Sequence, residues 1–515
     1  MKKKQLLLPI MLLTVLLLTG CVTQSGLVIT DSAPVATISP CEIKYAAPIG
    51  DAALEYEQTI ELYFPAYDGK TTVRNSTTVM HTPSRPFAET IVRELLESSS
   101  SPEHDSLGGK TKLTLYGSTP VEVSRNTAVI HLSATAKQLD KNRQYLVCQA
   151  IANSLCRNTD IESVSFLIGG QPFALDLGEK IPCGAFSFQD STDHTAQYQQ
   201  KLSTSSGFSE NTEKTLLNKV LLYFPIPGTE GVLAEDRMIL FDSSTPGGIV
   251  QTLLGELAAG PETKAITSPA LLGNVDFLTA VPNIAYSKEA HGNVIDLRFA
   301  DNWQEMINAY QLSENAVFAS LCLTLCTYVP DVVGLSISVG GTPIDTDLLI
   351  EDTDTELPAG KIILRKNMSA LLLDECTLYL PQRESRQIAA VKRPVPFMQV
   401  KNPRSLLINL CSADQPGDSR SDTLPALNHV ADTDIIGMCL ENDTLVVNLA
   451  LSFMRDRPLN EGITEQQMAY AMVNTLCENG PYQSVCFIQG GSWPEGFEGS
   501  ISWQGEFYPW FDPLQ

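Results

Sequence analysis

A four-residue pattern that occurs three times constrains the fold more than any other feature of this sequence. Leu62-Tyr63-Phe64-Pro65 recurs as Leu222-Tyr223-Phe224-Pro225 and again as Leu378-Tyr379-Leu380-Pro381. Each copy closes an apolar run, so each is expected to be a strand that ends at its proline. Recurrence at a long period is typical of chains built from repeated supersecondary units. We therefore expect tandem copies of one small unit, which also suits a length of 515 residues, or roughly three to four domains.

Two helices are expected in each copy. The first has apolar residues on one side and is expected over Pro86–Leu96, Gly248–Ala259 and Pro403–Cys411. The second carries an apolar stripe at helical spacing, which predicts that it packs against a sheet. The three stripes are Val147, Ile151 and Leu155; Val317, Leu321 and Leu325; and Met468, Met472 and Leu476.

Two further strands complete each copy. One is an apolar strand interrupted by a single polar residue, which is His131, Asp296 or Asn448. The other alternates apolar and polar residues. It ends at Gly169-Gly170, Gly340-Gly341 or Gly490-Gly491.

This order predicts an α/β fold of the α+β kind, with three tandem small modules, each a β-sheet with two helices packed on one face. Additional strands have room between the matched elements, for example within Lys112–Val123. The third copy is the most divergent, with a polar insertion after its short first helix. The expected divisions are a signal peptide at 1–20, a tether at 21–55, modules at 56–182, 215–350 and 371–491, polar linkers at 183–214 and 351–370, and an aromatic tail at 492–515.

The first twenty residues are expected to be a secretory signal. Lysines at positions 2–4 precede a Leu-rich stretch, Leu6–Leu18, which is short for a bilayer span of about 20 residues. The stretch runs into Leu18-Thr19-Gly20-Cys21, which resembles a bacterial lipobox. That resemblance implies a lipid on the Cys21 thiol, cleavage before Cys21, and an extracytoplasmic chain anchored to the cell membrane. The alternative is an ordinary signal peptide in which the cysteine is incidental.

The charge of the chain limits its partners. The net charge of −24, from 35 basic and 59 acidic residues, argues against nucleic acid, because phosphate binding needs a basic surface. Anionic lipid headgroups should also repel the chain, so a lipid on Cys21 would be needed to hold it at the membrane. The six histidines leave few options for metal ligands. We expect no metal, no cofactor and no small-molecule substrate.

The sequence offers no catalytic motif, and the chain is not expected to be an enzyme. Two Gly-Lys-Thr tripeptides, at 69–71 and 109–111, lack the earlier glycine of a phosphate-binding loop and are expected to be turns. Gly-x-Ser-x-Gly, His-Glu-x-x-His and Cys-x-x-Cys do not occur. Asp432 and Asp434 start a partial calcium-loop pattern that no glutamate closes, so a strand or turn is favoured. The three polar strand residues differ in their protonation chemistry, which favours a structural role for them.

The cysteines are numerous for an exported chain. Twelve occur, and without Cys21 an odd number remains, so at least one thiol is unpaired within the chain. Cys322 and Cys326 lie one turn apart on an apolar helix, and Cys156 and Cys477 share the helical position of Cys326. Buried free cysteine behaves as a small hydrophobic residue, so core thiols are favoured. Disulfides and a metal or redox role are the alternatives.

The repeated unit resembles the GerMN domain of the GerM family of sporulation and spore germination lipoproteins. The resemblance rests on the Leu-Tyr-Phe-Pro strands, the helix that ends at Gly260-Pro261, the Val294–Leu297 strand and the strand before Gly340-Gly341. It implies a non-enzymatic protein whose modules resemble the ring-building units of secretion and sporulation channels, with protein partners in an envelope complex between mother cell and forespore. The alternatives are a solute-binding lipoprotein of a transporter and a lipid-anchored hydrolase.

The segment after the third Gly-Gly pair is rich in aromatic residues. It holds three of the four tryptophans, Trp493, Trp503 and Trp510. One hypothesis is that these rings complete the third core, with a hairpin around Gly505. The other is a docking surface for a protein partner, because Trp and Tyr dominate interface hot spots. The three tryptophans are therefore candidate interaction residues.

Overall fold

The computed structural model describes most of the chain after residue 42. The described residues are 43–177, 180–190, 192–210, 216–262, 266–270, 278–344, 362–385, 387–455, 459–496 and 501–511. They all belong to one compact unit, which spans Ile43–Gln515. The expected signal segment and Cys21 lie outside the described residues. In the part that is described, no helix has the length and apolar character needed to cross a membrane.

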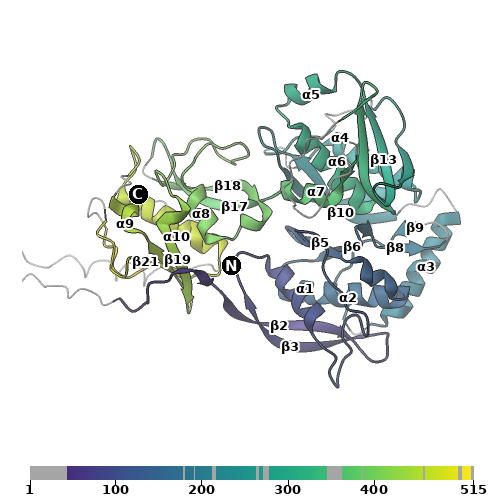
Figure 1. Cartoon of the computed structure of the whole chain (residues 1–515), viewed down its shortest axis with the longest axis horizontal. Coiled ribbons are helices and arrows are strands. Elements are labelled where there is room, and N and C mark those ends of the chain that lie inside the picture. Colours follow the sequence, from purple (N-terminus) through teal and green to yellow (C-terminus); the bar gives the residue numbers. More distant parts are fainter. Residues whose placement is uncertain are drawn as a thin grey trace, which may run out of the picture. The chain divides into compact units, whose positions relative to one another are not determined.

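One order of elements occurs three times: a long antiparallel hairpin, a helix, a short hairpin, a second helix and a final strand (Figure 1). The first module has β2 (Tyr56–Pro65), β3 (Thr72–His81), α1 (Phe87–Glu97), β4 (Val121–Ser124), β5 (Thr127–Leu132), α2 (Lys141–Asn158) and β6 (Ser163–Ile168). The second has β10 (Leu216–Pro225), β11 (Val232–Phe241), α4 (Pro246–Ala259), β12 (Asn283–Ser287), β13 (Gly292–Phe299), α6 (Glu314–Tyr328) and β14 (Val332–Val339). The third has β17 (Leu372–Pro381), β18 (Ile388–Pro396), α8 (Pro403–Asn409), β19 (Ile435–Glu441), β20 (Thr444–Leu449), α10 (Glu465–Asn479) and β21 (Ser484–Gln489).

Shorter elements lie between these. They are β1 (Gly50–Ala53), β7 (Gln171–Pro172), β8 (Ala174–Asp176), β9 (Lys180–Pro182), α3 (His194–Glu210), α5 (Trp303–Ala309), β15 (Thr342–Pro343), β16 (Ile363–Leu364), α7 (Arg365–Met368), α9 (Leu451–Arg455) and β22 (Glu506–Phe507). Short 3₁₀ turns cover Ala134–Gln138, Ser369–Leu371, Phe397–Gln399 and Asp432–Asp434.

In every module the short hairpin and the final strand form one sheet. β4 and β5 are antiparallel, whereas β6 runs parallel to β5 because α2 carries the chain back across the sheet. The same arrangement holds for β12–β13–β14 and β19–β20–β21. The long hairpin β2–β3 forms its own sheet, while β10–β11 and β17–β18 join through a short parallel contact between β11 and β17.

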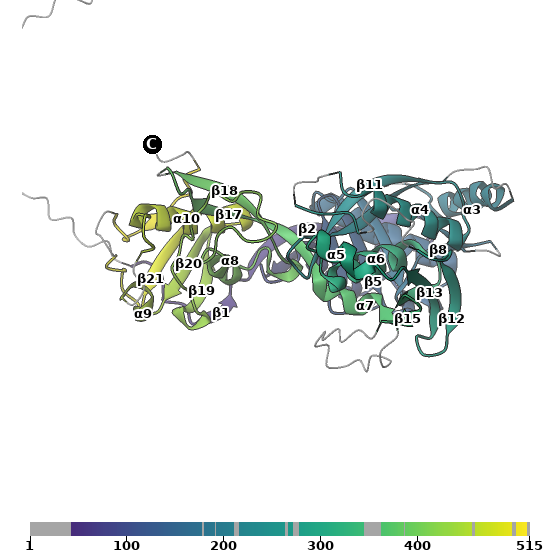
Figure 2. The ribbon, with the colours of Figure 1, turned by 90° about the horizontal axis from the view of Figure 1, so that it is seen from above.

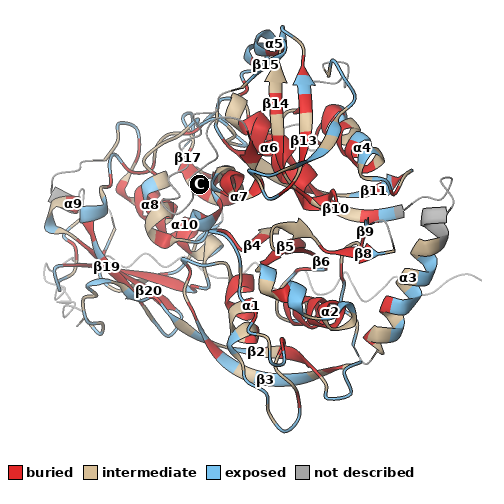
Figure 3. Cartoon of the chain, turned by 45° about the vertical axis from the view of Figure 1, so that its right-hand side comes forward, coloured by how far each residue is buried: buried red, intermediate tan, exposed pale blue. Residues whose placement is uncertain are grey.

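The second helix of each module lies in the core. All nine residues of the three predicted apolar stripes are at most 3% exposed, so the predicted burial is confirmed. In Figure 3, α2, α6 and α10 are drawn largely in the red of buried residues. Figure 2 shows α10 beside β17, the strand that carries the repeated tetrapeptide in the third module.

Polar side chains of the same helix bind the open edge of that strand. A buried hydroxyl accepts a hydrogen bond from the backbone N–H of the repeated tyrosine in every module. The pairs are Ser154 with Tyr63 (2.8 Å), Thr324 with Tyr223 (3.2 Å) and Thr475 with Tyr379 (2.9 Å). One helical turn later, Asn158, Tyr328 and Asn479 accept from the N–H two residues earlier in the strand. These side chains replace a neighbouring strand, because an unpaired strand edge must find other partners for its N–H groups.

The strand that pairs with the final strand of each module is β5, β13 or β20, and its polar position is shifted in the second module. The residues that pair opposite the last position before Gly-Gly are Leu132, Phe299 and Leu449. His131 and Asn448 precede this position and are equivalent, as expected. Arg298, and not Asp296, is their counterpart, so the expected equivalence of Asp296 was wrong. The reason is that β13 continues two residues beyond the Val-Ile-Asp-Leu sequence.

Each module begins with two strands, whereas the apolar runs predict only one. The second strands, β3, β11 and β18, pair along the whole length of the first. Polar and charged residues interrupt these strands at Arg74–Ser76, Glu235–Arg237 and Lys392–Arg393, so they lack the apolar run that marked the first strands. The expected first helices agree with α1, α4 and α8 to within two residues.

Both expected linkers contain residues that belong to a module. Within 183–214 the structure has α3, and its residues His194 and Tyr198 are buried against the first module. The polar composition predicted a linker here, because a helix that buries only one narrow face against the module can be polar elsewhere. Within 351–370, β16 pairs with β14, and Arg365 of α7 is buried. Residues 351–361 lie outside the described residues.

The expected tether is likewise structured at its end. Residues 43–54, here called the strap, lie on the third module, although they directly precede β2 of the first module. β1 runs parallel to β19, and Leu54 is buried in the third core. The Asp51 carboxylate receives two hydrogen bonds from the Arg404 guanidinium, at 2.8 and 2.9 Å. Pairing between segments so far apart leaves no local sequence signal, which is why a tether was expected.

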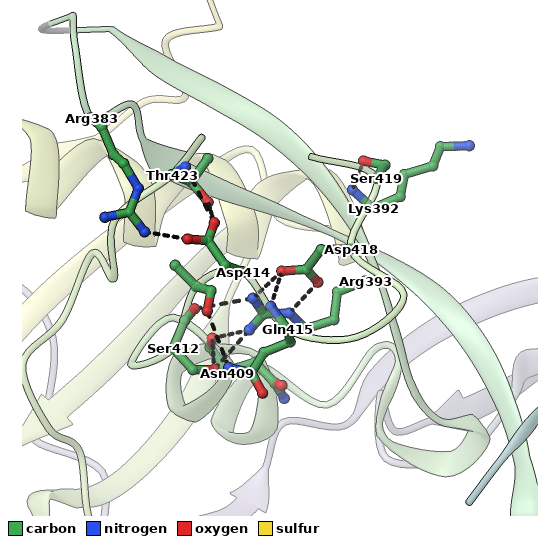
Figure 4. A network of polar contacts seen from close by, with 11 residues as sticks. Arg383, Lys392, Arg393, Asn409, Ser412, Asp414, Gln415, Asp418, Ser419 and Thr423 are labelled. Carbon is green, nitrogen blue, oxygen red and sulfur yellow. Dashed lines mark hydrogen bonds and ion pairs between the residues drawn. The ribbon is translucent and has the colours of Figure 1, made fainter. Parts of the chain in front are cut away.

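A buried arginine fixes the polar insertion of the third module (Figure 4). Arg393 in β18 forms a two-point ion pair with Asp418, at 2.7 and 2.8 Å, and both side chains are at most 3% exposed. The same guanidinium donates to the carbonyl oxygens of Asn409, at the end of α8, and Ser412. In the second module, Arg237 likewise donates to the carbonyl oxygen of Gly260 at the end of α4. A cation at a helix C-terminus is favourable, because it meets the unpaired carbonyls there.

Candidate interaction surface

Of the four predicted site residues, the structure describes the three tryptophans. Cys21 lies outside the described residues, and its lipidation stays a prediction. The tryptophans do not form one cluster. They lie in three different environments of the third module: one in the core, one beside the strap and one at the surface.

Trp503 belongs to the core. It is 2% exposed, and its Nε1–H donates to the buried Glu465 carboxylate at 2.7 Å. Its ring lies 5.5 Å from those of Phe487 and Phe507, in edge-on and tilted contacts that are typical of packed aromatic residues. Trp503 is therefore a structural residue and is removed from the candidate interaction set.

The end of the tail repeats a feature of the first module. Phe507 of β22 pairs with Val485, as Phe186 pairs with Val164 in the first module. Three residues later, the backbone N–H and C=O of Trp510 bond the Asn474 side chain, at 2.8 and 2.7 Å. Gln189 bonds Asn153 in the same two-way manner, at 2.8 Å for both contacts. Residues 505–510 thus complete the third module, as the first hypothesis for the tail stated. The expected hairpin around Gly505 is wrong, because β22 pairs with β21 and residues 501–503 form no strand.

The side chains at the end of this segment nevertheless reach the surface. Trp510 is 41% exposed and Phe511 51% exposed. Trp510 packs edge-on against Tyr470 of α10 at 5.3 Å, and Phe511 lies 5.5 Å from Tyr379 of β17. These four rings are here called the aromatic patch. Tyr508, which is 62% exposed, lies beside it in the sequence.

The aromatic patch combines apolar faces with polar groups. Burial raises the pKa of Tyr379 to about 12, and Glu478 adds to this effect, so the phenol stays protonated and can donate a hydrogen bond. The aromatic faces offer large contact areas at a low entropic cost, which is the composition of interface hot spots. The arrangement can bind a partner by stacking and apolar contact.

Trp493 packs on the other face of the third sheet. It lies with strap residues Ile43, Tyr45 and Ala47 against a small buried cluster made of Cys439, Val446, Cys486 and Ile488. Its surroundings therefore belong to the strap contact, and the aromatic patch does not include it. Composition could not separate the three tryptophans, because each lies in the same aromatic-rich segment.

His131, the polar strand residue of the first module, is part of a buried ion cluster. Its Nε2 lies 3.1 Å from the Glu122 carboxylate, which also receives two hydrogen bonds of 2.9 Å from Arg365 and one from the Tyr223 hydroxyl. Burial alone would raise the pKa of Glu122, but Arg365 and His131 hold it well below its usual range. Burial, with Arg365 nearby, lowers the pKa of His131. The cluster is enclosed by protein and joins β4 and β5 to residues of the second module, which is a structural role.

The remaining motifs have structural environments. Gly69-Lys70 and Gly109-Lys110 lie in turns, as expected. The ten described cysteines form no disulfide, and the sulfur atoms of Cys322 and Cys326 are 3.8 Å apart. Burial raises the pKa of Cys156 to about 11 and that of Cys477 to about 12, which keeps both thiols protonated. The favoured interpretation of core thiols agrees with this. In the described ranges, no group of three or more His, Cys, Asp or Glu side chains could hold a metal ion.

Comparison with known proteins gives one family match. The Germane family, described as sporulation and spore germination, matches residues 61–174. Among solved structures, the chain is similar to the tandem GerMN domains of the sporulation protein GerM from Bacillus subtilis, with 17% identity over 61% of this chain and 98% of that one and a TM-score of 0.22. No curated protein matches the chain. Because a TM-score this low supports no structural argument, the assignment rests on the sequence match. Residues 61–174, which lie in the first module, therefore match the Germane family of sporulation and spore germination.

Proposed function

We propose that this chain is a non-enzymatic, lipid-anchored extracytoplasmic protein of sporulation or spore germination, which acts as an assembly or scaffolding factor for an envelope-spanning complex. The observation that carries the proposal is the exposed aromatic patch on a module of a chain that also carries a Germane-family segment. The family match supports the sporulation or germination role. The patch supports binding of a protein partner.

The aromatic patch suits partner binding because its rings are held in place before a partner arrives. The backbone of Trp510 is fixed by Asn474, and its indole rests on Tyr470. A preorganised aromatic side chain loses little freedom on binding, so more of its contact energy appears as affinity. Exposed apolar side chains that lie together, unlike single ones, are typical of interaction surfaces.

The membrane contact would come from a lipid on Cys21. The chain between Cys21 and the strap is 21 residues long, and an extended chain spans about 3.3–3.6 Å per residue. The third module would therefore stay within roughly 75 Å of the bilayer. Because the chain is strongly acidic, the lipid would supply the membrane affinity by itself.

The test is to replace Trp510 and Phe511 by alanine together and to isolate the protein from sporulating cells. Both rings are about half exposed, and the Asn474 contacts use the backbone of Trp510, so the double variant should stay folded, with a thermal midpoint only a few degrees below that of the wild type. A protein that copurifies with the wild type should be lost. Tyr286→Ala, at a tyrosine that is 65% exposed on the second module, is the matched control.

The outcomes separate the proposed role from the solute-binding alternative. A sporulation or germination defect in the double variant, with normal nutrient uptake, would support the assembly role. Normal spores together with impaired uptake of a nutrient would favour a solute-binding lipoprotein. Copurification that the double variant leaves unchanged would remove the aromatic patch from the proposal.

A further inference from the structure

We propose that the outer face of the third module's sheet is a binding site for an extended peptide, which the chain's own strap occupies in this structure. The outer face consists of Cys439, Val446, Cys486, Ile488 and Trp493. Strap residues Ile43, Tyr45 and Ala47 pack on it at alternate positions, as an extended segment does when it lies across a sheet.

The backbone of the strap is also held, along the β19 edge of the sheet. Gly50 and Ala53 pair with Gly437 and Cys439 in a parallel register, and the Asn448 amide donates to the carbonyl oxygen of Pro48 at 2.8 Å. Adding a strand to a sheet edge in this way is a common mode of peptide recognition, in which main-chain hydrogen bonds give affinity and alternate side chains give specificity.

The strap can approach β19 closely because residue 437 is a glycine. A Cβ at this position would lie 2.5 Å from the backbone nitrogen of Gly50 and 2.6 Å from its carbonyl oxygen. Neither contact could be relieved by moving a side chain, because both atoms are backbone. A side chain at residue 437 would therefore close the site to any extended peptide in this register.

Two polar contacts make the site selective for particular side chains of the bound segment. The Tyr45 hydroxyl donates to Glu506 at one end. At the other end, Asp51 pairs with Arg404, which also donates to the carbonyl oxygens of Asp432 and Ile435. The site thus accepts a segment that has apolar or aromatic residues at every second position. The segment also carries a carboxylate about six residues after its aromatic ring.

In the first module, the same face of the repeated sheet is covered by residues from outside its own module. There, Val129 and Leu167 pack into the core of the second module, and the Ser124 hydroxyl donates to the carbonyl oxygen of Ala234 in β11. By strand register, Val129 corresponds to Val446 and Leu167 to Ile488. The third module uses the strap instead, so the occupant of this face differs between modules. A partner that supplies an extended segment with the strap's chemistry could take its place.

The experiment uses the full chain in detergent and a fluorescent peptide with the sequence of residues 43–54. Tyr45→Ser and Asp51→Asn are introduced together to weaken the strap without changing the outer face. The weakened chain should bind the peptide at least tenfold more tightly than the wild type, whose strap blocks the site. Adding Gly437→Val should abolish binding. Gly255→Val is the matched control, because a Cβ at Gly255 meets no atom within 4 Å.

Alkylation of cysteine provides a second readout. Cys486 is fully buried under the strap, so in the weakened chain it should react at least tenfold faster, and added peptide should protect it. Cys322, buried in the second module, must stay protected, which shows that the chain is still folded. Gly437→Val alone should also expose Cys486.

Three results would overturn the proposal. The first is a reactive Cys486 without peptide binding, since the open face would then not be a peptide site. The second is peptide binding that Gly437→Val does not reduce. The third is an unreactive Cys486 in both the weakened chain and the Gly437→Val chain, because the contacts named above would then not hold the strap.

Discussion

The hydroxyl of Thr475 allows a direct test of how the second helix holds the repeated strand. It is fully buried, and it accepts a hydrogen bond of 2.9 Å from the backbone N–H of Tyr379. Thr475→Val keeps the shape of the side chain but removes the acceptor. The N–H of Tyr379 would then be buried without a partner, because β18 pairs along the opposite edge of the strand.

The size of the effect follows from two opposing terms. Leaving a buried donor without a partner costs about 1–3 kcal/mol. The extra methyl group of valine returns up to about 0.8 kcal/mol of apolar burial. The expected net loss is roughly 1–2 kcal/mol in the free energy of unfolding, or about 2–8 °C in the thermal midpoint for a module of this size.

Tryptophan fluorescence is the assay, because three of the four tryptophans lie in the third module and the signal therefore reports mainly on its unfolding. Thr204→Val, at an exposed position of α3, is the control and should change stability by less than about 0.5 kcal/mol. If Thr475→Val behaves like this control, the helix does not stabilise the strand edge and the repeated hydroxyl has no role in the fold.

Four other predictions test separate features. Leu321→Ala should cost about 2–5 kcal/mol in chemical denaturation, because it opens a cavity under the sheet of the second module; a loss below about 0.5 kcal/mol would refute the packing. Arg393→Met should cost about 3–5 kcal/mol by stranding Asp418, and Asp418→Leu in the same chain should restore most of it. Burial, with Lys401 and Arg85 nearby, lowers the pKa of His81 to about 4. As the pH falls, the unfolded state therefore binds a proton before the folded state does, and stability should fall between about pH 6.5 and 4. His81→Gln should flatten that part of the stability profile. Cys21→Ser should leave the protein in the soluble fraction or its signal uncleaved, whereas a cleaved chain that stays in the membrane fraction would contradict lipidation.

The sequence predicted those parts of the fold that depend on local apolar periodicity. The stripes of α2, α6 and α10 and the strands before Gly-Gly were readable because each is buried on a face with helical or strand spacing. The hydroxyls at Ser154, Thr324 and Thr475 were also readable in principle, since each directly precedes a leucine of a stripe. They do not stand out in the sequence, because hydroxyl side chains lie outside the apolar pattern that marks the stripes.

Other features depend on contacts that no local pattern records. The strap pairs with a strand of the third module, and its Asp51 meets a partner 353 residues away in the chain. Within the aromatic tail, composition does not distinguish the buried Trp503 from the exposed Trp510. The sequence does hold one signal that the tail belongs to the module. Gly184-x-Phe186 in the first module matches Gly505-x-Phe507 in the third, and in each case the residue three positions after the phenylalanine bonds an asparagine of the second helix.

The strap also sets an order of events in folding. Its residues precede all three modules in the chain, yet Pro48 finds its partner 400 residues later, at Asn448. Because the strap is synthesised before the third module, it stays unpaired until the third sheet has formed. Because domains generally fold in the order of synthesis, the first two modules can form before this closure. Closing a loop that already contains folded modules costs less entropy than closing a flexible chain of the same length. Docking of the strap would thus be a late step, and a slow phase that Gly437→Val removes would mark it.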